Sequence, residues 1–315
     1  MKAKKRIAFI LVFAVVLAVL YGLVYGIVRY CKDISETGIN DTLPYGFGEE
    51  VTVILLAGQS NAAGCSSDAY LKQNVSEEQY QKYENGFDNV YINYYVSGNN
   101  DSSAFVKCKT RQGEGVEPGY FGPELGLAER LNELYPERKF FIIKYAWGGT
   151  NLFEEWLSPS AGDAGHLYNS FVAFVRASVK YLTAKNYKVN IESMCWMQGE
   201  SDSMLEEPAL NYAHNIECFI RDIRSEFADY ASEDGIAFID AYIAEVIFWT
   251  YYKEVNAGKQ AVADSDPNNR VIDTIAAGLT VTEEPHGEPD IAHFDSLSEI
   301  RLGQLFAEEI IDFLD

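Results

Sequence analysis

Basic residues are scarce in this chain. Its 315 residues include 25 Lys and Arg against 47 Asp and Glu, a formal net charge of −22 at pH 7. No acidic residue precedes Asp33, and six of the cations lie at or before Lys32, so residues 33–315 carry 19 cations and 47 anions, a net charge of −28. Such a surface repels nucleic-acid phosphates and anionic lipid head groups. We therefore expect no nucleic-acid partner and interpret the charge as an acidic coat that keeps the protein in solution.

Metal-binding patterns are also missing from the sequence. The chain has four His and five Cys, with no Cys-x-x-Cys pair and no His-rich run. We therefore expect no metal site. In an oxidising compartment, Cys65 and Cys108 are candidates to bridge the two ends of the long segment after the first predicted strand, although the sequence leaves the pairing open. Cys195 is expected to be a small buried residue of a core strand.

A cleavage signal is missing at the amino terminus, which otherwise has the pattern of an export segment. Four cations in MKAKKR precede Ile7 to Val28, a run of 22 residues without a charged side chain. At a rise of 1.5 Å per residue the run extends about 33 Å, enough to cross a bilayer core of about 30 Å. It exceeds the usual signal-peptide core and lacks an Ala-x-Ala site. We predict a cytoplasmic stub and transmembrane signal anchor within residues 1–32 that holds the remainder outside the cell. Cleavage, which would give a secreted protein, is the alternative.

The remaining sequence contains a polar connector, residues 33–49, and one domain, residues 50–315. Internal repeats, low-complexity tracts and a second linker are lacking. Continuous apolar runs predict five buried strands: Val51–Ala57, Val90–Val96, Phe140–Ala146, Ile191–Met197 and Ile236–Ile239. Helical patterns alternate with them: Pro123–Leu134, His166–Asn186, Pro208–Tyr230, Ala241–Ala263 and Ser298–Leu314. This alternation predicts an α/β domain with a central parallel sheet of about five strands between helical layers.

Polar and glycine-rich segments follow the predicted strands at their carboxyl ends, where α/β folds bind ligands. Ser60 lies in GQSN after the first strand, WGGTNL follows the third, QGESD follows the fourth, and a late loop contains DIAH. A Ser hydroxyl becomes a nucleophile when a base removes its proton, and the base needs an orienting group. Asp290 and His293 lie three residues apart in the late loop and supply the types required for such a pair.

Each segment also has a purely conformational explanation. Gly, Ser and Asn are common in tight turns, so GQSN and the Gly148–Gly149 pair can be turns without a catalytic role. Among the other histidines, His166 and His214 lie in helical patterns, whereas His286 has Glu283 nearby and is the main rival base. Taken singly, the segments are weak indications of catalysis.

The four segments in this order resemble the SGNH hydrolases, and among them the carbohydrate esterases of the sialate O-acetylesterase and acetylxylan esterase kind. The segment FGPELGLAERL is similar to the Gly-Pro-Glu helix start of that family, and the resemblance spans residues 51–315. It implies a three-layer α/β/α sandwich of the flavodoxin-like SGNH type, a serine esterase mechanism and no cofactor. Ser298 stands where the family often has glycine, and we expect it to cap the last helix.

Position by position, the resemblance implies Ser60 as nucleophile, His293 as general base and Asp290 as its orienting carboxylate. The implied oxyanion donors are the N–H groups of Ser60 and of Gly148 or Gly149, and the side-chain amide of Gln198. The implied supporting residues are Gln59, Asn61, Glu200 and Asp202.

The expected function is the removal of O-acetyl groups from carbohydrate through an acyl-enzyme. The alternatives are a lipid or thioester hydrolase of the same fold and a catalytically silent carbohydrate-binding surface protein. A GxSxG α/β-hydrolase is excluded because Ala62 occupies the second glycine position. The segment 65–119 either borders a sugar-binding cleft or is a surface excursion. The acetylated glycan, the ring position and the oligomeric state stay open.

We predict a small acyl pocket, so activity should collapse between acetyl and butyryl or longer esters. A chain-length series of nitrophenyl esters measures this directly. A profile that is flat or rises with chain length would favour the lipid or thioester alternative.

Overall fold

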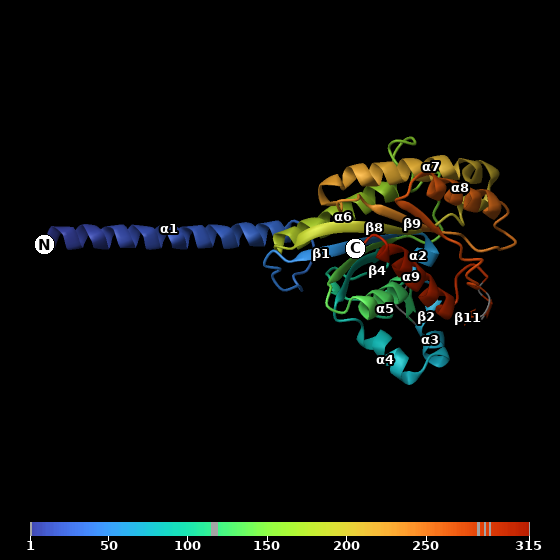
Figure 1. The fold of residues 1–315 in the computed structure, drawn as a ribbon, viewed down its shortest axis with the longest axis horizontal. Coiled ribbons are helices and arrows are strands. Elements are labelled where there is room, and N and C mark those ends of the chain that lie inside the picture. The colour runs from blue at the N-terminus through green and yellow to red at the C-terminus, as the bar shows by residue number, and fades with distance from the viewer. Residues whose placement is uncertain (1, 115–118, 282–283, 287, 290, 315) are drawn as a thin grey trace.

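A mainly parallel β-sheet forms the centre of the domain (Figure 1). The computed structural model describes residues 2–114, 119–281, 284–286, 288–289 and 291–314. The strands of the sheet are β1 (Glu50–Gly58), β3 (Val90–Val96), β4 (Asn100–Asp101), β5 (Val106–Lys107), β7 (Phe140–Ala146), β8 (Lys188–Met197), β9 (Ala237–Ala241) and β10 (Asn269–Ile272). Their order is β10-β9-β8-β1-β7-β3-β4, with β5 also paired to β3. Only the two-residue strands β4 and β5 run antiparallel to their neighbour in this sheet.

All five predicted strands are present. The bounds of β3 and β7 agree with the prediction, and β1, β8 and β9 differ from it by one to three residues at an end. Residues 51–58 and the whole of β7 are buried, as continuous apolar runs require when both faces of a sheet are covered. The sheet is nevertheless larger than predicted. The strand β10 was missed because Asn269 and Arg270 interrupt its apolar pattern.

Helices cover both faces of the sheet (Figure 1). On one face lie α6 (His166–Ala184), α7 (Glu206–Glu226) and α8 (Tyr252–Ser265), and on the other lie α5 (Glu124–Leu134) and α9 (Ser296–Ile311). The α/β fold with a parallel sheet is therefore confirmed. The predicted helix Ala241–Ala263 is wrong in its first half. Residues 242–251 form a loop, because the side-chain amide of Asn256 bonds both the N–H and the carbonyl of Ile243 at 2.9 Å and holds it in a non-helical conformation.

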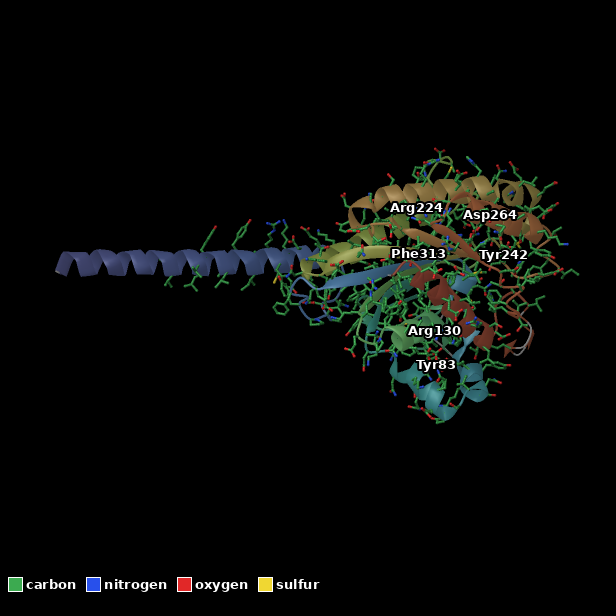
Figure 2. All side chains as sticks on the ribbon, in the orientation of Figure 1. Tyr83, Arg130, Arg224, Tyr242, Asp264 and Phe313 are labelled. Carbon is green, nitrogen blue, oxygen red and sulfur yellow. The ribbon has the colours of Figure 1, made fainter. Side chains whose placement is uncertain are left out.

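The segment between β1 and β7 adds small elements at one side of the domain. These and the other short elements are α2 (Ser60–Ala63), β2 (Ser66–Ser67), α3 (Asp68–Asn74), α4 (Glu77–Asn85), β6 (Tyr120–Phe121), 3-10 turns at Asp202–Met204 and Ala228–Tyr230, β11 (Pro285–His286) and β12 (Glu288–Pro289). Tyr83 of α4 donates to the carboxylate of Glu129 on α5 at 3.0 Å, which ties the excursion to the helical layer (Figure 2).

The candidate bridge between Cys65 and Cys108, which the sequence left open, is not formed. Cys108 is buried, and its thiol donates to the Glu124 carbonyl at 3.5 Å. The Cys65 thiol instead faces the carboxylate of Glu114. Cys195 is buried in β8, as predicted, and burial raises the pKa of its thiol.

The long helix α1 (Lys2–Ser35) projects from one end of the domain (Figure 1). Its carboxyl end meets α6, where Glu36 pairs with Lys180 at 2.8 Å. The transmembrane anchor predicted within residues 1–32 is not supported. Within the described part of the chain, no helix has both the length and the apolar character needed to cross a bilayer.

Helices α5 and α9 approach each other closely because each has a glycine at the crossing. A Cβ on Gly126 would lie 1.9 Å from the carbonyl oxygen of Ile300, and one on Gly303 would lie 2.0 Å from that of Pro123. Neither position tolerates a side chain unless the helices move apart. The N-cap of α9 is Asp295, whose carboxylate accepts from the Ser298 N–H at 3.0 Å, so the predicted cap at Ser298 is wrong.

The carboxyl group of Glu299 is buried at this helix crossing. Glu299 is 1% exposed, and neither of its oxygens has a hydrogen-bond partner among the described residues. Burial raises its pKa well above the ordinary value, and the nearby carboxylate of Glu124 raises it further, while Lys144 lowers it. The folded protein therefore holds a proton on Glu299 at pH values where the unfolded chain has released it.

This difference predicts that the free energy of unfolding falls as the pH rises above about 4.5, by up to about 1.4 kcal/mol per pH unit from this group. Glu299→Gln removes the titration, so the stability of the variant relative to wild type should increase with pH. Urea denaturation between pH 4.5 and 8 measures it. Glu308→Gln, a more exposed change on the same helix, serves as the control. A stability difference that stays constant with pH for Glu299→Gln would contradict a raised pKa.

Candidate active site

Three neighbouring strands, β8, β1 and β7, end at the same level of the sheet. Gly58 at the end of β1 pairs with Met197 on one side and with Ala146 on the other. The segments GQSN, WGGT and QGESD therefore leave the sheet side by side. This is the edge at which ligands bind in parallel α/β folds.

A tight turn after β1 presents Ser60. Gly58 has a φ of 143°, and a Cβ there would lie 2.0 Å from the carbonyl oxygen of Met197, so the position requires glycine. The Gln59 N–H donates to the same carbonyl at 2.9 Å. Ser60 then opens α2 and is 9% exposed. The small residues of this segment thus serve the turn, and the turn brings Ser60 to the carboxyl edge of the sheet.

The side chain of Asn61 connects this turn to the loop that contains His293. Its Nδ2 donates to the carbonyl of Ala292 at 3.3 Å, and its Oδ1 accepts from the N–H of Phe294 at 3.0 Å. These are the two residues that flank His293. The Ser66 hydroxyl also donates to the Phe294 carbonyl, at 2.7 Å. The residue next to Ser60 therefore fixes the backbone on both sides of the predicted base.

His293 is half-buried and lies near the carboxyl group of Glu200. Glu200 is 2% exposed, and its Oε1 accepts from Asn61 Nδ2 at 2.7 Å. Burial raises the pKa of Glu200, while the hydrogen bond from Asn61 and the charge of His293 act to lower it. An ionised Glu200 would in turn stabilise the protonated imidazole. The other predicted partner of the base, Asp290, lies outside the described residues.

The QGESD turn is linked to both neighbouring segments by buried hydrogen bonds. Gln198 Nε2 donates to the carboxylate of Asp202 at 2.6 Å and to the carbonyl of Thr150 at 3.0 Å. The side-chain carbonyl of Gln59 accepts from Gln198 Nε2 at 3.3 Å and from the Ser201 N–H at 3.2 Å. Both amide hydrogens of Gln198 thus have acceptors within the protein. Its role as an oxyanion donor stays a prediction.

Asp202 connects QGESD to the segment after β7. Its carboxylate accepts from the N–H groups of Leu152 and Phe153 at 2.9 to 3.1 Å. Burial raises the pKa of Asp202 to about 6, although the hydrogen bonds from Gln198 and from these two N–H groups oppose the rise. These bonds join the QGESD turn to the segment after β7, and the supporting role of Asp202 stays a prediction.

The two glycines after β7 differ in their surroundings. The Gly148 N–H donates to the hydroxyl of Ser97 at 3.0 Å, and a Cβ on Gly148 would lie 2.8 Å from Oε2 of Glu114. Gly149 is exposed, has a φ of 70°, and would have open space around a Cβ. The sequence did not predict that the carboxylate of Glu114 lies beside Gly148, because the two residues are 34 positions apart and no sequence pattern connects them.

Two of the three rival histidines, His166 and His214, lie away from this cluster. His166 begins α6 and His214 lies on α7, where both are exposed. The side chain of His286 is outside the described residues, so its candidacy as the general base is untested. Among the described residues, no group of three His, Cys, Asp or Glu side chains is placed to hold a metal ion. The described groups at this edge are a hydroxyl, an imidazole, amides and carboxylates, the types that support acyl transfer through a serine.

One known protein family matches most of the chain. Residues 50–312 match the family described as carbohydrate esterase, sialic acid-specific acetylesterase. The chain belongs to this family. The predicted resemblance is confirmed, and as a member of this carbohydrate esterase family the protein is an acetylesterase that acts on carbohydrate esters. No curated protein gives a significant match to the chain.

Two of the following solved structures, those with TM-scores above 0.5, share the fold of this carbohydrate esterase. A protein from Arabidopsis thaliana has a TM-score of 0.62 at 18% identity, covering 84% of this chain and 98% of that one. NanS has a TM-score of 0.60 at 15% identity, covering 86% and 99%. A catalytic mutant of the acetylxylan esterase Axe2 from Geobacillus stearothermophilus has a TM-score of 0.44 at 12% identity, covering 84% and 95%. At these identities the likeness concerns the fold alone.

The contacts of Asn61 generate a prediction for the esterase. Asn61→Asp keeps the acceptor for Phe294 N–H but replaces the donor to Glu200 and Ala292 with a carboxylate oxygen. We expect a loss of about 1 to 3 kcal/mol in the free energy of unfolding, because buried acceptors then face each other. We also expect kcat to fall more than KM rises, since the backbone around His293 loses its support.

Denaturation and steady-state kinetics on an acetyl ester measure both effects. Asn211→Asp makes the same chemical change on the exposed face of α7 and serves as the control. Wild-type stability and kcat in Asn61→Asp would show that the His293 loop is held by other contacts.

Proposed function

We propose that the protein removes O-acetyl groups from carbohydrate through a covalent acetyl-enzyme on Ser60. In the first half-reaction, Ser60 Oγ attacks the acetyl carbonyl carbon while His293 accepts the hydroxyl proton. The tetrahedral intermediate then collapses as His293 returns that proton to the departing sugar oxygen. In the second half, His293 deprotonates a water that attacks the acetyl carbonyl carbon, and the intermediate collapses to release acetate as His293 returns the proton to Ser60 Oγ.

The observation that carries this proposal is the pair of hydrogen bonds that Asn61 makes with the residues on either side of His293, donating to the Ala292 carbonyl and accepting from the Phe294 N–H. Ser60 and Asn61 are adjacent, so the same turn that carries the nucleophile anchors the loop of the base. A general base must lie within hydrogen-bond reach of the proton that it removes. Anchoring both groups on one turn supports this geometry, although they are 233 positions apart in the sequence.

We assign the oxyanion donors to the N–H groups of Ser60 and Gly149. Of the two candidate glycines, Gly149 is favoured because the N–H of Gly148 already donates to Ser97. Gln198 would have to release one of its present acceptors to take part. Loss of a single oxyanion donor typically lowers kcat about 100- to 1,000-fold.

We assign the orienting role to Asp290 and an electrostatic role to Glu200. Asp290 is three residues from His293 in the same loop, whereas Glu200 has its Oε1 engaged by Asn61. Glu200 would thus stabilise the protonated imidazole without fixing its tautomer. The location of the domain outside the cell stays a prediction from the amino-terminal sequence.

Acetate release from acetylated oligosaccharides by point variants tests these roles. Ser60→Ala should abolish turnover, and Asp290→Asn should lower kcat by about 10⁴-fold, because the wrong tautomer of the base is then favoured. Glu200→Gln should lower kcat about tenfold, which corresponds to the loss of about 1.4 kcal/mol of charge stabilisation in the transition state. Ser160→Ala, at an exposed serine, is the matched control.

Acetylesterase activity that survives Ser60→Ala would refute the nucleophile. If Glu200→Gln were the more damaging of the two carboxylate variants, the orienting role would pass from Asp290 to Glu200.

A further inference from the structure

The segments that surround Ser60 contain no cation. In sequence, Lys and Arg are absent from six stretches near the carboxyl edge of the sheet: residues 58–71, 147–165, 197–220, 242–252 and 271–300, at or after the ends of β1, β7, β8, β9 and β10, and residues 113–129, which lead into α5. Several of the same stretches carry carboxylates. A substrate that reaches Ser60 therefore passes through a region of negative charge, within a chain whose net charge is −22.

One of these carboxylates lies directly beside the predicted oxyanion segment. The backbone of Glu114 is fixed by its N–H, which donates to the Gly64 carbonyl at 2.8 Å, and its Oε2 accepts from the Cys65 thiol at 3.5 Å. The same oxygen would lie 2.8 Å from a Cβ on Gly148. The side chain of Glu114 thus occupies the space between the turn that follows α2 and the turn that follows β7. Trp147, half-buried, precedes Gly148, and its ring lies near that of Tyr95, with the ring centroids 6.3 Å apart.

The buried lysines near the site are already neutralised. Lys144 pairs with Glu124 at 2.6 Å, and Lys259 pairs with Asp240 at 2.5 Å. Both lysine side chains are fully buried. Lys253, at the start of α8, lines a hollow with Asp273 on the β9–β10 side of the sheet, two strands away from β1.

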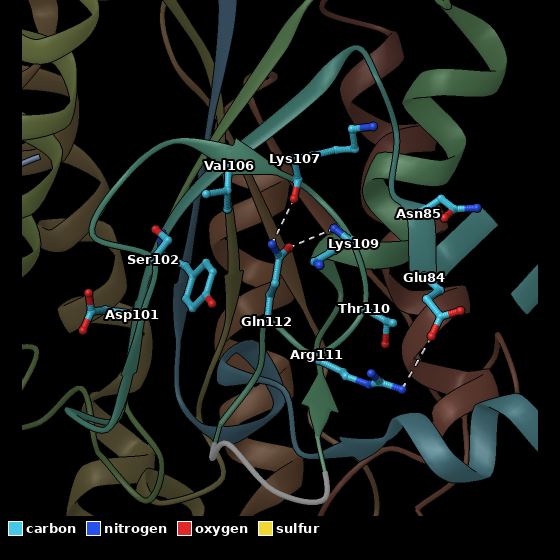
Figure 3. Close-up of a pocket in the computed structure, with 11 residues that line it drawn as sticks. Glu84, Asn85, Asp101, Ser102, Val106, Lys107, Lys109, Thr110, Arg111 and Gln112 are labelled. Atoms are coloured by element: carbon cyan, nitrogen blue, oxygen red, sulfur yellow. Dashed lines mark hydrogen bonds and ion pairs between the residues drawn. The ribbon is translucent and has the colours of Figure 1, made fainter. Parts of the chain in front are cut away.

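The other cations of this region gather in a separate cavity (Figure 3). This cavity of about 650 Å³ is lined by Lys107, Lys109 and Arg111, together with Glu84 and other residues of the excursion. None of its lining residues belongs to the six cation-free stretches, as far as the described residues show. Arg111 is also engaged there, because its guanidinium pairs with Asp68 at 2.8 Å and with Glu84 at 3.9 Å.

We propose that the site selects acetylated sugars without a charge and discriminates against acidic ones such as sialate and uronate units. The inference rests on the proposed function of Ser60. A sugar carboxylate bound there would approach Glu114, and the stretches around Ser60 supply no Lys or Arg to balance the two negative charges; such like-charge contact disfavours binding. A neutral sugar instead offers hydroxyl donors to the carboxylate of Glu114. The selectivity would therefore differ from the sialic acid specificity in the description of the family.

The test compares substrates that differ only in charge. Acetylated glucuronic acid is paired with its glucuronamide, and O-acetylated N-acetylneuraminic acid with its carboxamide, with acetate release as the readout. We expect kcat/KM to be at least about tenfold higher for the amide of each pair at low ionic strength. The gap should narrow in about 0.5 M NaCl, because salt screens exposed charges. Equal values within each pair, or faster turnover of the acids, would overturn the proposal.

Charge removal at Glu114 tests the residue itself. In Glu114→Gln the ratio of acid to amide turnover should rise at least about threefold within the same protein preparation. Glu133→Gln removes the same charge from the 54% exposed end of α5 at the opposite edge of the sheet, and its ratio should equal that of wild type. An unchanged ratio in Glu114→Gln would remove this residue as the source of selectivity.

Hydrolysis of nitrophenyl acetate, a neutral ester, distinguishes a failure of the proposed charge selectivity from a failure of the proposed function. Hydrolysis of this neutral ester through Ser60 with no preference within the sugar pairs overturns the charge selectivity alone. A protein that hydrolyses neither nitrophenyl acetate nor any of the acetylated sugars overturns the proposed function.

Discussion

The arrangement of the site depends on the side-chain amide of Asn61. It donates to Glu200 and to the carbonyl of Ala292, and it accepts from the N–H of Phe294. One buried side chain thereby joins the turn after β1, the end of β8 and the loop before α9. Because an amide has both donor and acceptor atoms, it can satisfy groups of opposite kind on the two sides of His293. A carboxylate or a hydrophobic residue of similar size would leave at least one of these buried groups unsatisfied.

This local junction is supported by the packing behind it. The glycines at positions 126 and 303 let α5 and α9 approach closely, and α9 begins two residues after Phe294. The position of the His293 loop is therefore coupled to a helix crossing in the core. The buried carboxyl of Glu299 lies at that crossing and makes the same region sensitive to pH. Stability and the geometry of the site are thus determined by overlapping contacts.

Sequence patterns predicted those parts of the fold that depend on local preference. The run of β3 lies between Asn89 and Ser97, and the run of β7 follows Lys139 and ends two residues before Gly148, so the bounds of both strands could be predicted from the sequence. The start of α8 could not be predicted, because residues 241–246 are mostly apolar and their non-helical conformation depends on contacts that are distant in sequence. Asn256 bonds Ile243, and the Tyr242 N–H donates to the Ile272 carbonyl at 2.9 Å. The sequence motifs predicted that Ser60 and the QGESD segment follow strands at the carboxyl edge of the sheet. The approach of Glu114 to Gly148 results from a long excursion without periodicity, so only the folded structure places it.

Catalysis by this site requires that His293 activates Ser60 across the Asn61 junction. Reaction with a serine-directed fluorophosphonate, followed by peptide mass spectrometry, tests it most directly. We expect a single adduct, on Ser60. In His293→Ala the rate of labelling should fall at least about 100-fold, because general-base assistance typically contributes about 10²- to 10⁴-fold. Labelling of a different residue, or labelling of Ser60 at the wild-type rate in His293→Ala, would contradict this activation.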